Sequence, residues 1–308
     1  MSTLTSSLTI GTRGSALARW QAEWVVARLR AAWPELNCRI QLFTTSGDRT
    51  LDKPLPEIGG KGVFTAELED ALRAKEIDIA VHSLKDLPVD DAPGLMLGAI
   101  GPREDARDVL ISSAGSPFSA LRRGARVGTS SLRRAAQLLA VRPDLTLLPL
   151  RGNVDTRIRK VQQGDYDAIV LAAAGVIRLG LEANISEFLS FDVMLPAPGQ
   201  GALAIQCRLD DVPVLELLSA LEDVSTRAAV SAERAFLQHL GGGCAAPIAA
   251  YAQSTIGHPL SAVSLTGLVA SPDGRRIIRV SGEGAEPLAL GQKLAEKALT
   301  QGAGELLQ

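Results

Sequence analysis

Short apolar segments alternate with amphipathic segments along roughly the first two-thirds of the chain, and this alternation restricts the fold more than any other sequence feature. Residues 8–12, 39–43 and 77–82 have the apolar, β-branched character of strands. Two helical patterns separate them, one from the N-cap Ser15 to Pro34 and one over residues 64–72. Strands joined by crossover helices pair in parallel, so we expect a parallel sheet with helices on both faces.

A second alternation of the same kind begins near Ile100. It comprises predicted strands at residues 108–111, 125–129, 146–150 and 166–171, and predicted helices at residues 131–141 and 154–163. The chain-breaking segment Pro196-Ala-Pro-Gly-Gln-Gly201 follows, and residues 202–206 resume as a strand. We expect the chain to return there to the first domain, so that two strands connect the two domains as a hinge.

The character of the chain changes after about residue 223. A long helical pattern precedes three short strands, and the turn Pro272-Asp-Gly274 joins the last two strands as a hairpin. These elements are a helix at 226–240, strands at 249–253, 264–270 and 276–280, and a final helix at 287–300. We therefore expect three domains: a discontinuous α/β domain (1–99 and 201–222), a second α/β domain (100–200) and a small α+β domain (223–308).

The overall charge and the cysteine content exclude several classes of protein. The 308 residues carry 32 lysines and arginines against 34 acids, and this net charge of −2 gives no sign of nucleic-acid binding. Three widely spaced cysteines fit neither a disulfide framework nor a zinc site, so we predict no metal. The chain shows no signal peptide and no apolar run of membrane-spanning length, so we expect a cytoplasmic protein without a membrane partner.

Basic and hydroxyl side chains gather where the predicted strands end. Ligands of open parallel sheets bind at the carboxyl ends of the strands. The sequence places there Arg13, Ser15, Lys61, Lys85, Asp86, Thr129, Ser130, Ser131, Arg133, Arg134, Arg151 and Arg157. Because the chain as a whole is slightly acidic, this local excess of cations favours a small ligand that carries several carboxylates or phosphates.

The segment Gly128-Thr-Ser-Ser-Leu-Arg-Arg134 is the strongest anion-binding candidate. A strand stops at the glycine, and three hydroxyl residues begin a helix whose free N–H groups and dipole favour negative charge. An ordinary helix cap with solvated arginines is the alternative interpretation. The segment Arg151-Gly-Asn-Val-Asp-Thr-Arg157 repeats the design in the next strand–helix unit, which favours the functional interpretation. Neither segment matches a phosphate-binding P-loop.

The segment His82-Ser-Leu-Lys-Asp-Leu-Pro88 also has two interpretations. In one, Lys85 and Asp86 form a surface ion pair of little value. In the other, neighbouring cations hold Asp86 ionised, ready to stabilise a developing positive charge or to relay a proton. We interpret His82 as structural or as a residue that supports the site from behind, and Cys38 and Cys207 as small core residues.

Cys244 follows three glycines and precedes Pro247, at the end of the long helical pattern. One glycine is enough to end a helix. Three leave the thiol on a backbone without bulky neighbours, which favours a reactive or modified cysteine over a buried structural one.

Seven segments in chain order resemble the porphobilinogen deaminase family, also called the hydroxymethylbilane synthase family. They are Thr12-Arg13-x-Ser15-x-Leu17-Ala18, Gly59-Gly60-Lys61-Gly62, His82-Ser-Leu-Lys-Asp-Leu-Pro88, Gly128-Thr-Ser-Ser-Leu-Arg-Arg134, Arg151-Gly-Asn-Val, Pro198-Gly-Gln-Gly201 and Gly241-Gly-Gly-Cys244. The resemblance implies two α/β domains similar to type II periplasmic binding proteins, joined by a two-strand hinge, with a small α+β C-terminal domain. It implies a cytoplasmic transferase that joins four porphobilinogen molecules head to tail, releases ammonia, and gives the linear tetrapyrrole hydroxymethylbilane of porphyrin and heme biosynthesis.

The resemblance also implies residue roles. The family carries a dipyrromethane cofactor on a cysteine thioether, which matches Cys244, and its catalytic aspartate matches Asp86. The positions that bind acetate and propionate side chains match Arg13, Ser15, Lys85, Ser131, Arg133, Arg134, Arg151 and Arg157, with Thr129 and Ser130 beside them. Lys61 and Gln200 match a lid or supporting position, and Glu57 departs from the family because relatives often carry lysine there. The family implies a monomer.

Two other functions use parts of the same pattern. A non-catalytic solute-binding protein for a polycarboxylate would share the fold and the cationic corners. It would not need both Asp86 and Cys244. An enzyme that uses Cys244 as a turnover nucleophile would need a histidine base nearby, and His239 lies in the predicted helix rather than in the loop.

Overall fold

The computed structural model describes residues 6–49, 62–90, 92–242, 246–254 and 262–307. The chain forms two compact units. The first contains residues 1–103 and 202–227, and the second contains residues 104–201 and 228–308. Neither unit is therefore a continuous stretch of sequence. The division into three domains stays a prediction, since the second unit holds the second predicted domain together with most of the third.

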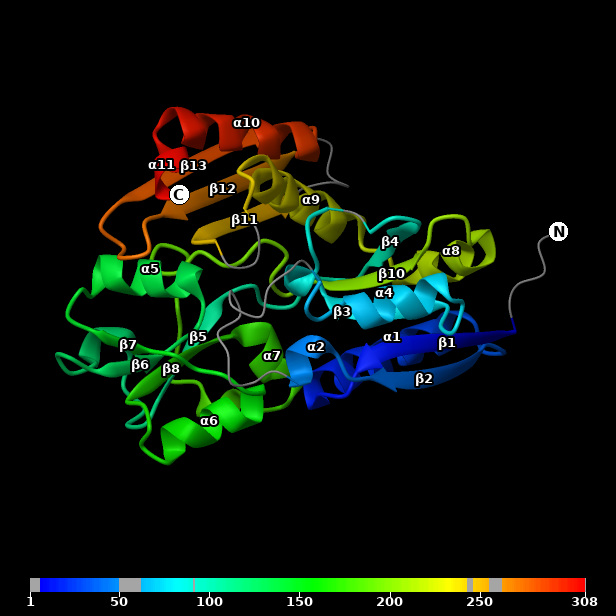
Figure 1. The fold of residues 1–308 in the computed structure, drawn as a ribbon, viewed down its shortest axis with the longest axis horizontal. Helices are drawn as coiled ribbons and strands as arrows, with labels where there is room; N and C mark the ends of the chain where they lie inside the picture. The colour runs from blue at the N-terminus through cyan, green and yellow to red at the C-terminus, as the bar shows by residue number, and fades with distance from the viewer. Residues whose placement is uncertain (1–5, 50–61, 91, 243–245, 255–261, 308) are drawn as a thin grey trace. The chain divides into compact units, whose positions relative to one another are not determined.

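A five-stranded sheet lies at the centre of the first unit, in the order β2-β1-β3-β10-β4 (Figure 1). Its strands are β1 (Ser7–Arg13), β2 (Asn37–Phe43), β3 (Ile79–Ser83), β4 (Leu95–Ile100) and β10 (Leu203–Arg208). β1 is parallel to β2 and to β3, as predicted. β10 is antiparallel to β3 and β4, because it enters the sheet directly after a passage between the units rather than through a crossover helix. The expected parallel sheet is therefore a mixed sheet.

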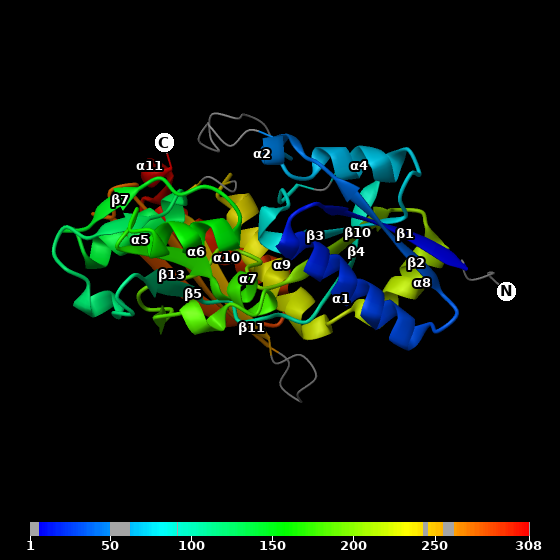
Figure 2. The ribbon, with the colours of Figure 1, turned by 90° about the horizontal axis from the view of Figure 1, so that it is seen from below.

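Helices cover both faces of this sheet (Figure 2). They are α1 (Ala16–Ala32), α2 (Ser46–Arg49), α4 (Ala66–Arg73) and α8 (Val212–Leu218). Successive residues of β3 point to opposite faces. Ile79 and Val81 pack against α1 and α8 in the larger core, where Leu29 is fully buried, whereas Ala80 packs with Leu68 of α4. The alternation predicted for this strand is confirmed.

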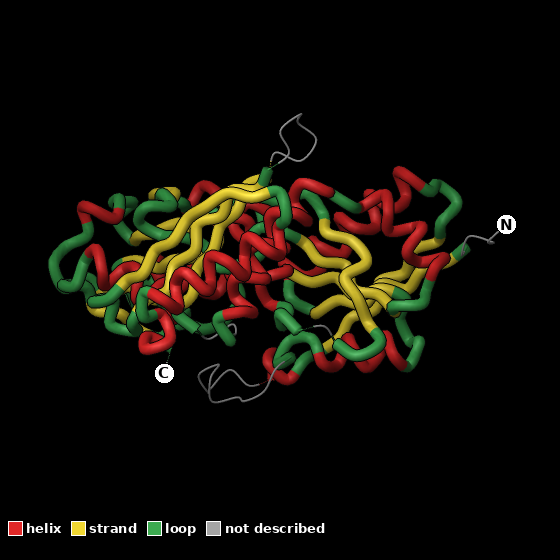
Figure 3. The backbone as a smooth tube through the Cα atoms, turned by 90° about the horizontal axis from the view of Figure 1, so that it is seen from above, coloured by secondary structure: helices red, strands yellow, loops and turns green. Residues whose placement is uncertain are grey.

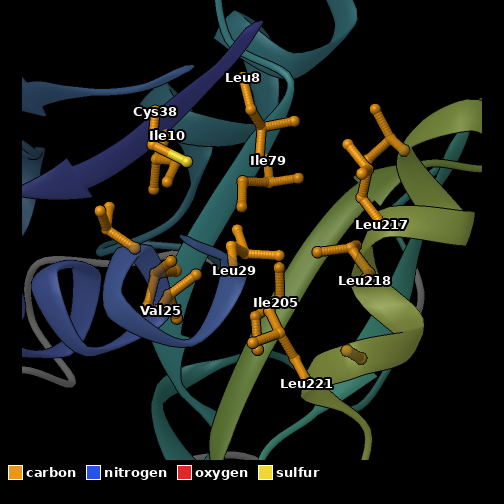
Figure 4. Packing of buried hydrophobic residues seen from close by; sticks show 14 of the residues in the cluster. Leu8, Ile10, Val25, Leu29, Cys38, Ile79, Ile205, Leu217, Leu218 and Leu221 are labelled. Atoms are coloured by element: carbon orange, nitrogen blue, oxygen red, sulfur yellow. The ribbon is translucent and has the colours of Figure 1, made fainter. Parts of the chain in front are cut away.

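Cys38 (Figure 4) and Cys207 both lie in the larger core, as predicted. Burial raises the pKa of the Cys38 thiol and raises that of Cys207 to about 11. Neither residue is therefore a thiolate near neutral pH, so neither offers a nucleophile or an attachment point.

The second unit contains a sheet with an equivalent arrangement, in the order β7-β6-β8-β5-β9. Its strands are β5 (Asp108–Ser112), β6 (Arg126–Gly128), β7 (Thr146–Leu148), β8 (Ala168–Ala172) and β9 (Glu187–Phe188). β6 is parallel to β7 and β8, whereas β5 is antiparallel to β8 and β9. In each sheet the antiparallel strand is the one that follows a passage between units. The predicted pair of α/β folds is confirmed.

Helices also cover both faces of the second sheet. They are α5 (Leu132–Val141), α6 (Val154–Gln162) and α7 (Ala173–Arg178). On one face, Val127 and Val170 pack with Leu138 of α5. On the other face, Ile169 packs with Ile158 of α6. The helices predicted at 131–141 and 154–163 are confirmed, whereas α7 was not predicted.

The C-terminal part of the second unit is an antiparallel sheet, β11-β12-β13, with helices packed along it (Figures 1 and 3). Its elements are α9 (Val224–His239), β11 (Ile248–Ser254), β12 (Val263–Ala270), β13 (Ile277–Gly284), α10 (Pro287–Thr300) and α11 (Ala303–Leu306). The predicted hairpin between β12 and β13 is confirmed. No helix in the described part of the chain is both long enough and apolar enough to cross a membrane.

Two contacts fix this part within the unit. The fully buried carboxylate of Glu233 on α9 accepts hydrogen bonds from the N–H groups of Gly199 and Ala252, each at 2.7 Å. The hairpin turn at Gly274 packs against the backbone of α5, since a Cβ there would lie 2.3 Å from the oxygen of Ala136. The C-terminal elements therefore support both the segment before β10 and helix α5.

The close packing at Gly274 gives a stability prediction. Its φ of +71° already favours glycine, and an added methyl would also overlap the α5 backbone. We expect Gly274→Ala to lower the free energy of unfolding by about 2–4 kcal/mol, measured by urea denaturation. Gly115→Ala is the control, because Gly115 has a φ of +66° with nothing within 4 Å, and should cost about 1 kcal/mol. Equal losses would show that the contact with α5 contributes nothing.

Candidate functional site

The first unit brings four of the predicted site residues to one edge of its sheet. β1 and β3 are parallel neighbours, with Ile10 opposite Ile79. Arg13 ends β1, and the short 3-10 helix η1 (Leu84–Asp86) follows β3. Ser15 caps α1, and its Oγ accepts a hydrogen bond from the N–H of Ala18 at 3.3 Å. Arg13, Ser15, Lys85 and Asp86 therefore share the carboxyl edge, and the predicted cap is confirmed.

Asp86 is an exposed carboxylate on a rigid support. Leu84 and Leu87, which flank Lys85 and Asp86 in the sequence, are 0% and 5% exposed. The N–H of Leu84 donates to the carbonyl of Ala202 at 3.0 Å, and the N–H of Leu87 donates to Leu84 at 3.1 Å. Among the described residues, no cation forms an ion pair with Asp86, so the Lys85–Asp86 surface pair is not observed. The backbone that carries Asp86 is therefore held in place, while its side chain is exposed.

Two contacts orient the cationic part of this edge. The guanidinium carbon of Arg13 lies 4.3 Å from the centre of the Phe64 ring, a cation–π arrangement that limits the rotamers of the arginine. The buried amide of Gln21 on α1 donates to the hydroxyl of Ser83 at 2.8 Å, which ties the helix to the end of β3. The half-buried Arg13 is therefore positioned before any ligand binds.

His82 lies beneath this edge and is only 6% exposed. Burial lowers the pKa of its imidazole to about 4, the side chain of Gln206 opposes that shift, and the charge of Arg13 adds to it. The side chain is therefore neutral near pH 7. A neutral buried imidazole agrees with the predicted structural role.

The second unit places three hydroxyl residues at the carboxyl end of β6. Ser131 caps α5, and its Oγ accepts from the N–H of Arg134 at 3.4 Å. Ser130 donates its O–H to the carbonyl of Leu150 at 3.0 Å and accepts from the Leu150 N–H at 2.9 Å. This single hydroxyl hydrogen is therefore already used to join the ends of β6 and β7. Ser131 keeps its hydroxyl hydrogen for a ligand, whereas Ser130 holds the loop.

The next strand–helix corner repeats the pattern less regularly. Gly152 has a φ of +114°, which turns the chain into α6. Asn153 occupies the N-cap position without a side-chain hydrogen bond. The Nε of Arg157 donates to the carbonyl of Gly152 at 2.7 Å, so this arginine folds back over the start of its own helix. Arg151 precedes the turn and is half-buried. Both predicted cations lie at this corner.

Arg133 and Arg134 are 5% and 7% exposed, so the alternative of two solvated arginines is wrong. Both pair with Asp108, the fully buried first residue of β5, at 2.8 Å and 2.7 Å. Burial alone would raise the pKa of Asp108, but the two guanidinium groups hold it well below its usual range. Gln200, which is also fully buried, donates its Nε2 to the same carboxylate at 3.0 Å.

Sequence reasoning missed Asp108 and Arg178. Asp108 was assigned only to the start of a strand, and the available signal was a lone acid next to an apolar run, Val109-Leu-Ile111. Arg178 ends α7, is 8% exposed and donates to the carbonyl of Gly201 at 2.7 Å. Burial lowers its pKa to about 10, although Glu104 opposes the shift. Its position at the end of an unpredicted helix left no signal in the sequence.

Two predicted residues lie outside the described part of the chain. These are Cys244 and Lys61, and Glu57 also falls there. α9 ends at His239, and Gly241 after it has a φ of +65°. This left-handed glycine matches the predicted end of the helix. The assignment of Cys244 as an attachment point therefore stays a prediction.

The two sheet edges share a donor chemistry of guanidinium, ammonium and hydroxyl groups around helix starts, typical of an α/β protein that binds organic carboxylates. Comparisons with known proteins specify the family. Residues 8–216 match the model for the porphobilinogen deaminase, dipyromethane cofactor binding domain, and residues 227–300 match the porphobilinogen deaminase, C-terminal domain. The chain belongs to the porphobilinogen deaminase family.

Individual relatives agree over nearly the full length. The chain is 52% identical to the porphobilinogen deaminase of Brevibacillus brevis, over 97% of this chain and 96% of the relative. It is 51% identical to the porphobilinogen deaminase of Syntrophotalea carbinolica, over 98% and 95%. A more distant likeness, at 14% identity and a TM-score of 0.42, links 76% of the chain to 70% of the periplasmic aliphatic sulphonate binding protein SsuA from Escherichia coli.

The donor groups fit the dipyrromethane that the family's domain name specifies. Two pyrrole units that each carry an acetate and a propionate present four carboxylates, which need N–H and O–H donors. Among the described residues, the Nε and Nη2 groups of Arg133 and the hydroxyl hydrogen of Ser131 have no acceptor. A guanidinium edge without a protein acceptor is available to bind a carboxylate. The chemistry of these donors therefore matches the group.

The depressed pKa of His82 makes stability depend on pH. Between pH 6.5 and about 4 the unfolded state binds the imidazole proton and the folded state does not, so stability falls as the pH is lowered through this window. We expect His82→Gln to lose less unfolding free energy than the wild type over that range, by on the order of 3 kcal/mol. Urea denaturation at several pH values measures the difference. His239→Gln, at an exposed position, should follow the wild type; parallel curves for all three proteins would contradict the prediction.

Proposed function

We propose that this protein joins four porphobilinogen molecules head to tail, releases one ammonia at each step, and gives the linear tetrapyrrole hydroxymethylbilane. Membership of the porphobilinogen deaminase family over nearly the whole chain supports this activity. The observation that carries the catalytic assignment is the exposed carboxylate of Asp86 on the anchored backbone of η1, at the same sheet edge as Arg13, Ser15 and Lys85. A binding protein needs the cations of this edge, but not a carboxylate among them.

Asp86 stabilises positive charge. Loss of ammonia from porphobilinogen leaves an electrophilic carbon conjugated with the pyrrole nitrogen, and attack on that carbon places positive charge on the ring. A fixed carboxylate next to the nitrogen lowers the energy of this charge more than water does, because it needs no reorganisation. The short η1 helix, anchored by Leu84 and Leu87, keeps Asp86 fixed.

The cationic and hydroxyl residues hold the carboxylates. Each porphobilinogen brings one acetate and one propionate, so every addition needs further donors. Arg13, Ser15 and Lys85 supply them in the first unit, and Thr129, Ser131, Arg133, Arg134, Arg151 and Arg157 supply them in the second. The planar guanidinium fork binds a carboxylate through two parallel hydrogen bonds. Ser130 acts by holding the loop, and Gln200 acts as a supporting residue.

Cys244 carries the dipyrromethane through a thioether. When bound, this group supplies the pyrrole carbon to which the first substrate is joined. The glycines before Cys244 carry no side chains. They therefore allow the sulfur to approach the residues that bind the acetate and propionate groups. A permanent thioether also explains why no histidine base is needed beside the thiol. Lys61 is assigned to a lid over the growing chain.

The remaining assignments follow from the activity. The enzyme acts as a cytoplasmic monomer in porphyrin biosynthesis, and its partner is the small-molecule substrate rather than nucleic acid or membrane. The net charge of −2 supports the first of these exclusions. Sedimentation at micromolar concentration should give the mass of one chain.

Intact mass measurement tests the proposed attachment. The purified wild type should exceed its sequence mass by two covalently joined pyrrole units, and Cys244→Ser should match its sequence mass and be inactive, because no thiol remains to hold them. Cys38→Ala is the matched control and should retain the increment, since Cys38 lies in the core. A fully active wild type without any added mass would overturn the proposal. It would instead favour the solute-binding or thiol-enzyme alternatives.

Removing the charge of Asp86 tests its role. We expect Asp86→Asn to keep the two-pyrrole mass increment while kcat falls by about 10²–10³-fold, because the asparagine amide no longer offsets the positive charge in the transition state. Asp70→Asn on α4 removes an exposed carboxylate of the same unit and should leave kcat unchanged. Initial rates of porphobilinogen consumption provide the measurement. Near-normal turnover by Asp86→Asn would refute the assignment.

A further inference from the structure

Asp108 accepts hydrogen bonds from donors in two other parts of the second unit. It begins β5, and its side chain is 0% exposed. Arg133 and Arg134 approach from the first turn of α5, and Gln200 approaches from the segment before β10. All the donors meet one carboxylate, so the position of Asp108 determines where both guanidinium groups lie.

The hydrogen bonds determine which edge of each guanidinium is used. Within the described residues, Arg133 donates only through Nη1, to Asp108 at 2.8 Å and to the carbonyl of Leu195 at 2.7 Å. Arg134 donates through Nε, Nη1 and Nη2, to Asp108 and to the carbonyl of Val170. The Nε–Nη2 edge of Arg133 therefore has no acceptor among the described residues. This edge has the two parallel N–H groups that bind a carboxylate in a bidentate manner.

The charge balance of the cluster also indicates that it binds one ligand carboxylate. Two buried cations and one buried anion leave a net charge of +1. Without Asp108 the two guanidinium groups would repel each other in a poorly solvated place and would turn toward water. With Asp108 present, a single ligand carboxylate neutralises the cluster. The acid thus allows two adjacent arginines to stay buried before a ligand arrives.

Gln200 fixes the acid itself. Its Nε2 donates to the carbonyl of Ala106 at 2.8 Å as well as to Asp108 at 3.0 Å. Gln200 is fully buried, and the N–H of the preceding Gly199 is bound by Glu233. The carboxylate of Asp108 therefore has little freedom to move. Because Arg133 pairs with it, the position of Arg133 is restricted as well.

We infer that Asp108 is a positioning residue of the carboxylate-binding site, which holds Arg133 and Arg134 so that the Nε–Nη2 edge of Arg133 meets a pyrrole acetate or propionate. This inference rests on the proposed function. Asp108 touches no reacting atom and acts only through the arginines. Loss of the acid should therefore impair cofactor loading and substrate affinity, and leave the chemical step at Asp86 intact.

The test uses three variants of the full chain. Asp108→Asn removes the charge, whereas Asp108→Glu keeps the charge but moves the carboxylate by one methylene group. Asp167→Asn is the matched control, because Asp167 also pairs with two arginines, Arg122 and Arg126, at the opposite ends of β6 and β8. Three quantities are measured for each: the thermal unfolding midpoint, the fraction of molecules with the two-pyrrole mass increment, and kcat and KM of the loaded fraction.

We expect both Asp108 variants to show a lower loaded fraction, and a KM for porphobilinogen raised about tenfold or more with kcat nearly unchanged, since a displacement of about 1 Å is enough to misplace a binding group. Asp167→Asn should be destabilised yet fully loaded, with the wild-type KM. Normal loading and KM in Asp108→Glu would overturn the inference, because charge alone would then be sufficient.

The other outcomes are also decisive. If Asp167→Asn loses loading as the Asp108 variants do, the effect is one of general stability and the inference fails. If neither Asp108 variant folds, the acid belongs to the stability of the fold, and the inference also fails. A wild type without the mass increment would instead overturn the proposed function, so the two failures are distinguishable.

Discussion

The ion pairs of Asp108 with Arg133 and Arg134 are the interaction around which the second unit's part of the proposed site is built. They join β5, α5 and the segment that leads back to the first unit, in a place closed to water. A buried charge is tolerated only when it is paired and hydrogen-bonded, so each of these residues requires the others. The cost of desolvating three charges is thus offset within the protein, and the cluster still keeps donors for a ligand.

The strands and most helices could be predicted because their apolar periodicity is local. Ile79, Ala80 and Val81 alternate between two cores, and Leu17 to Leu29 mark one face of α1. The directions of β5 and β10 could not be predicted in this way. A strand pattern is the same in either direction, and these two directions depend on where the chain passes between units.

The corners that hold the candidate site residues were predictable for a related reason. A parallel sheet gathers its carboxyl ends at one edge, so Arg13, Ser131 and Arg157 could be placed from strand order alone. The hydrogen-bond partner of each donor group could not be predicted. Ser130 and Ser131 are adjacent hydroxyls in the sequence, yet the first is bound to Leu150 and the second is open to a ligand. Such differences depend on contacts about twenty residues away or more, as do the counter-ion Asp108 and the buried Arg178. The assignments to Cys244 and Lys61 remain predictions.

The discontinuity of the first unit affects how the chain folds during synthesis. β10 is an interior strand of the first sheet, lying between β3 and β4, yet it is translated long after both of them. At typical elongation rates of roughly 5–20 residues per second, on the order of ten seconds separate the emergence of β4 from that of β10. Until then β3 and β4 lack the partner that joins them, and their apolar edges are open to mispairing. A nascent chain of this topology is therefore expected to depend on chaperones over that interval, and the second sheet, whose strands are all contiguous, can form first.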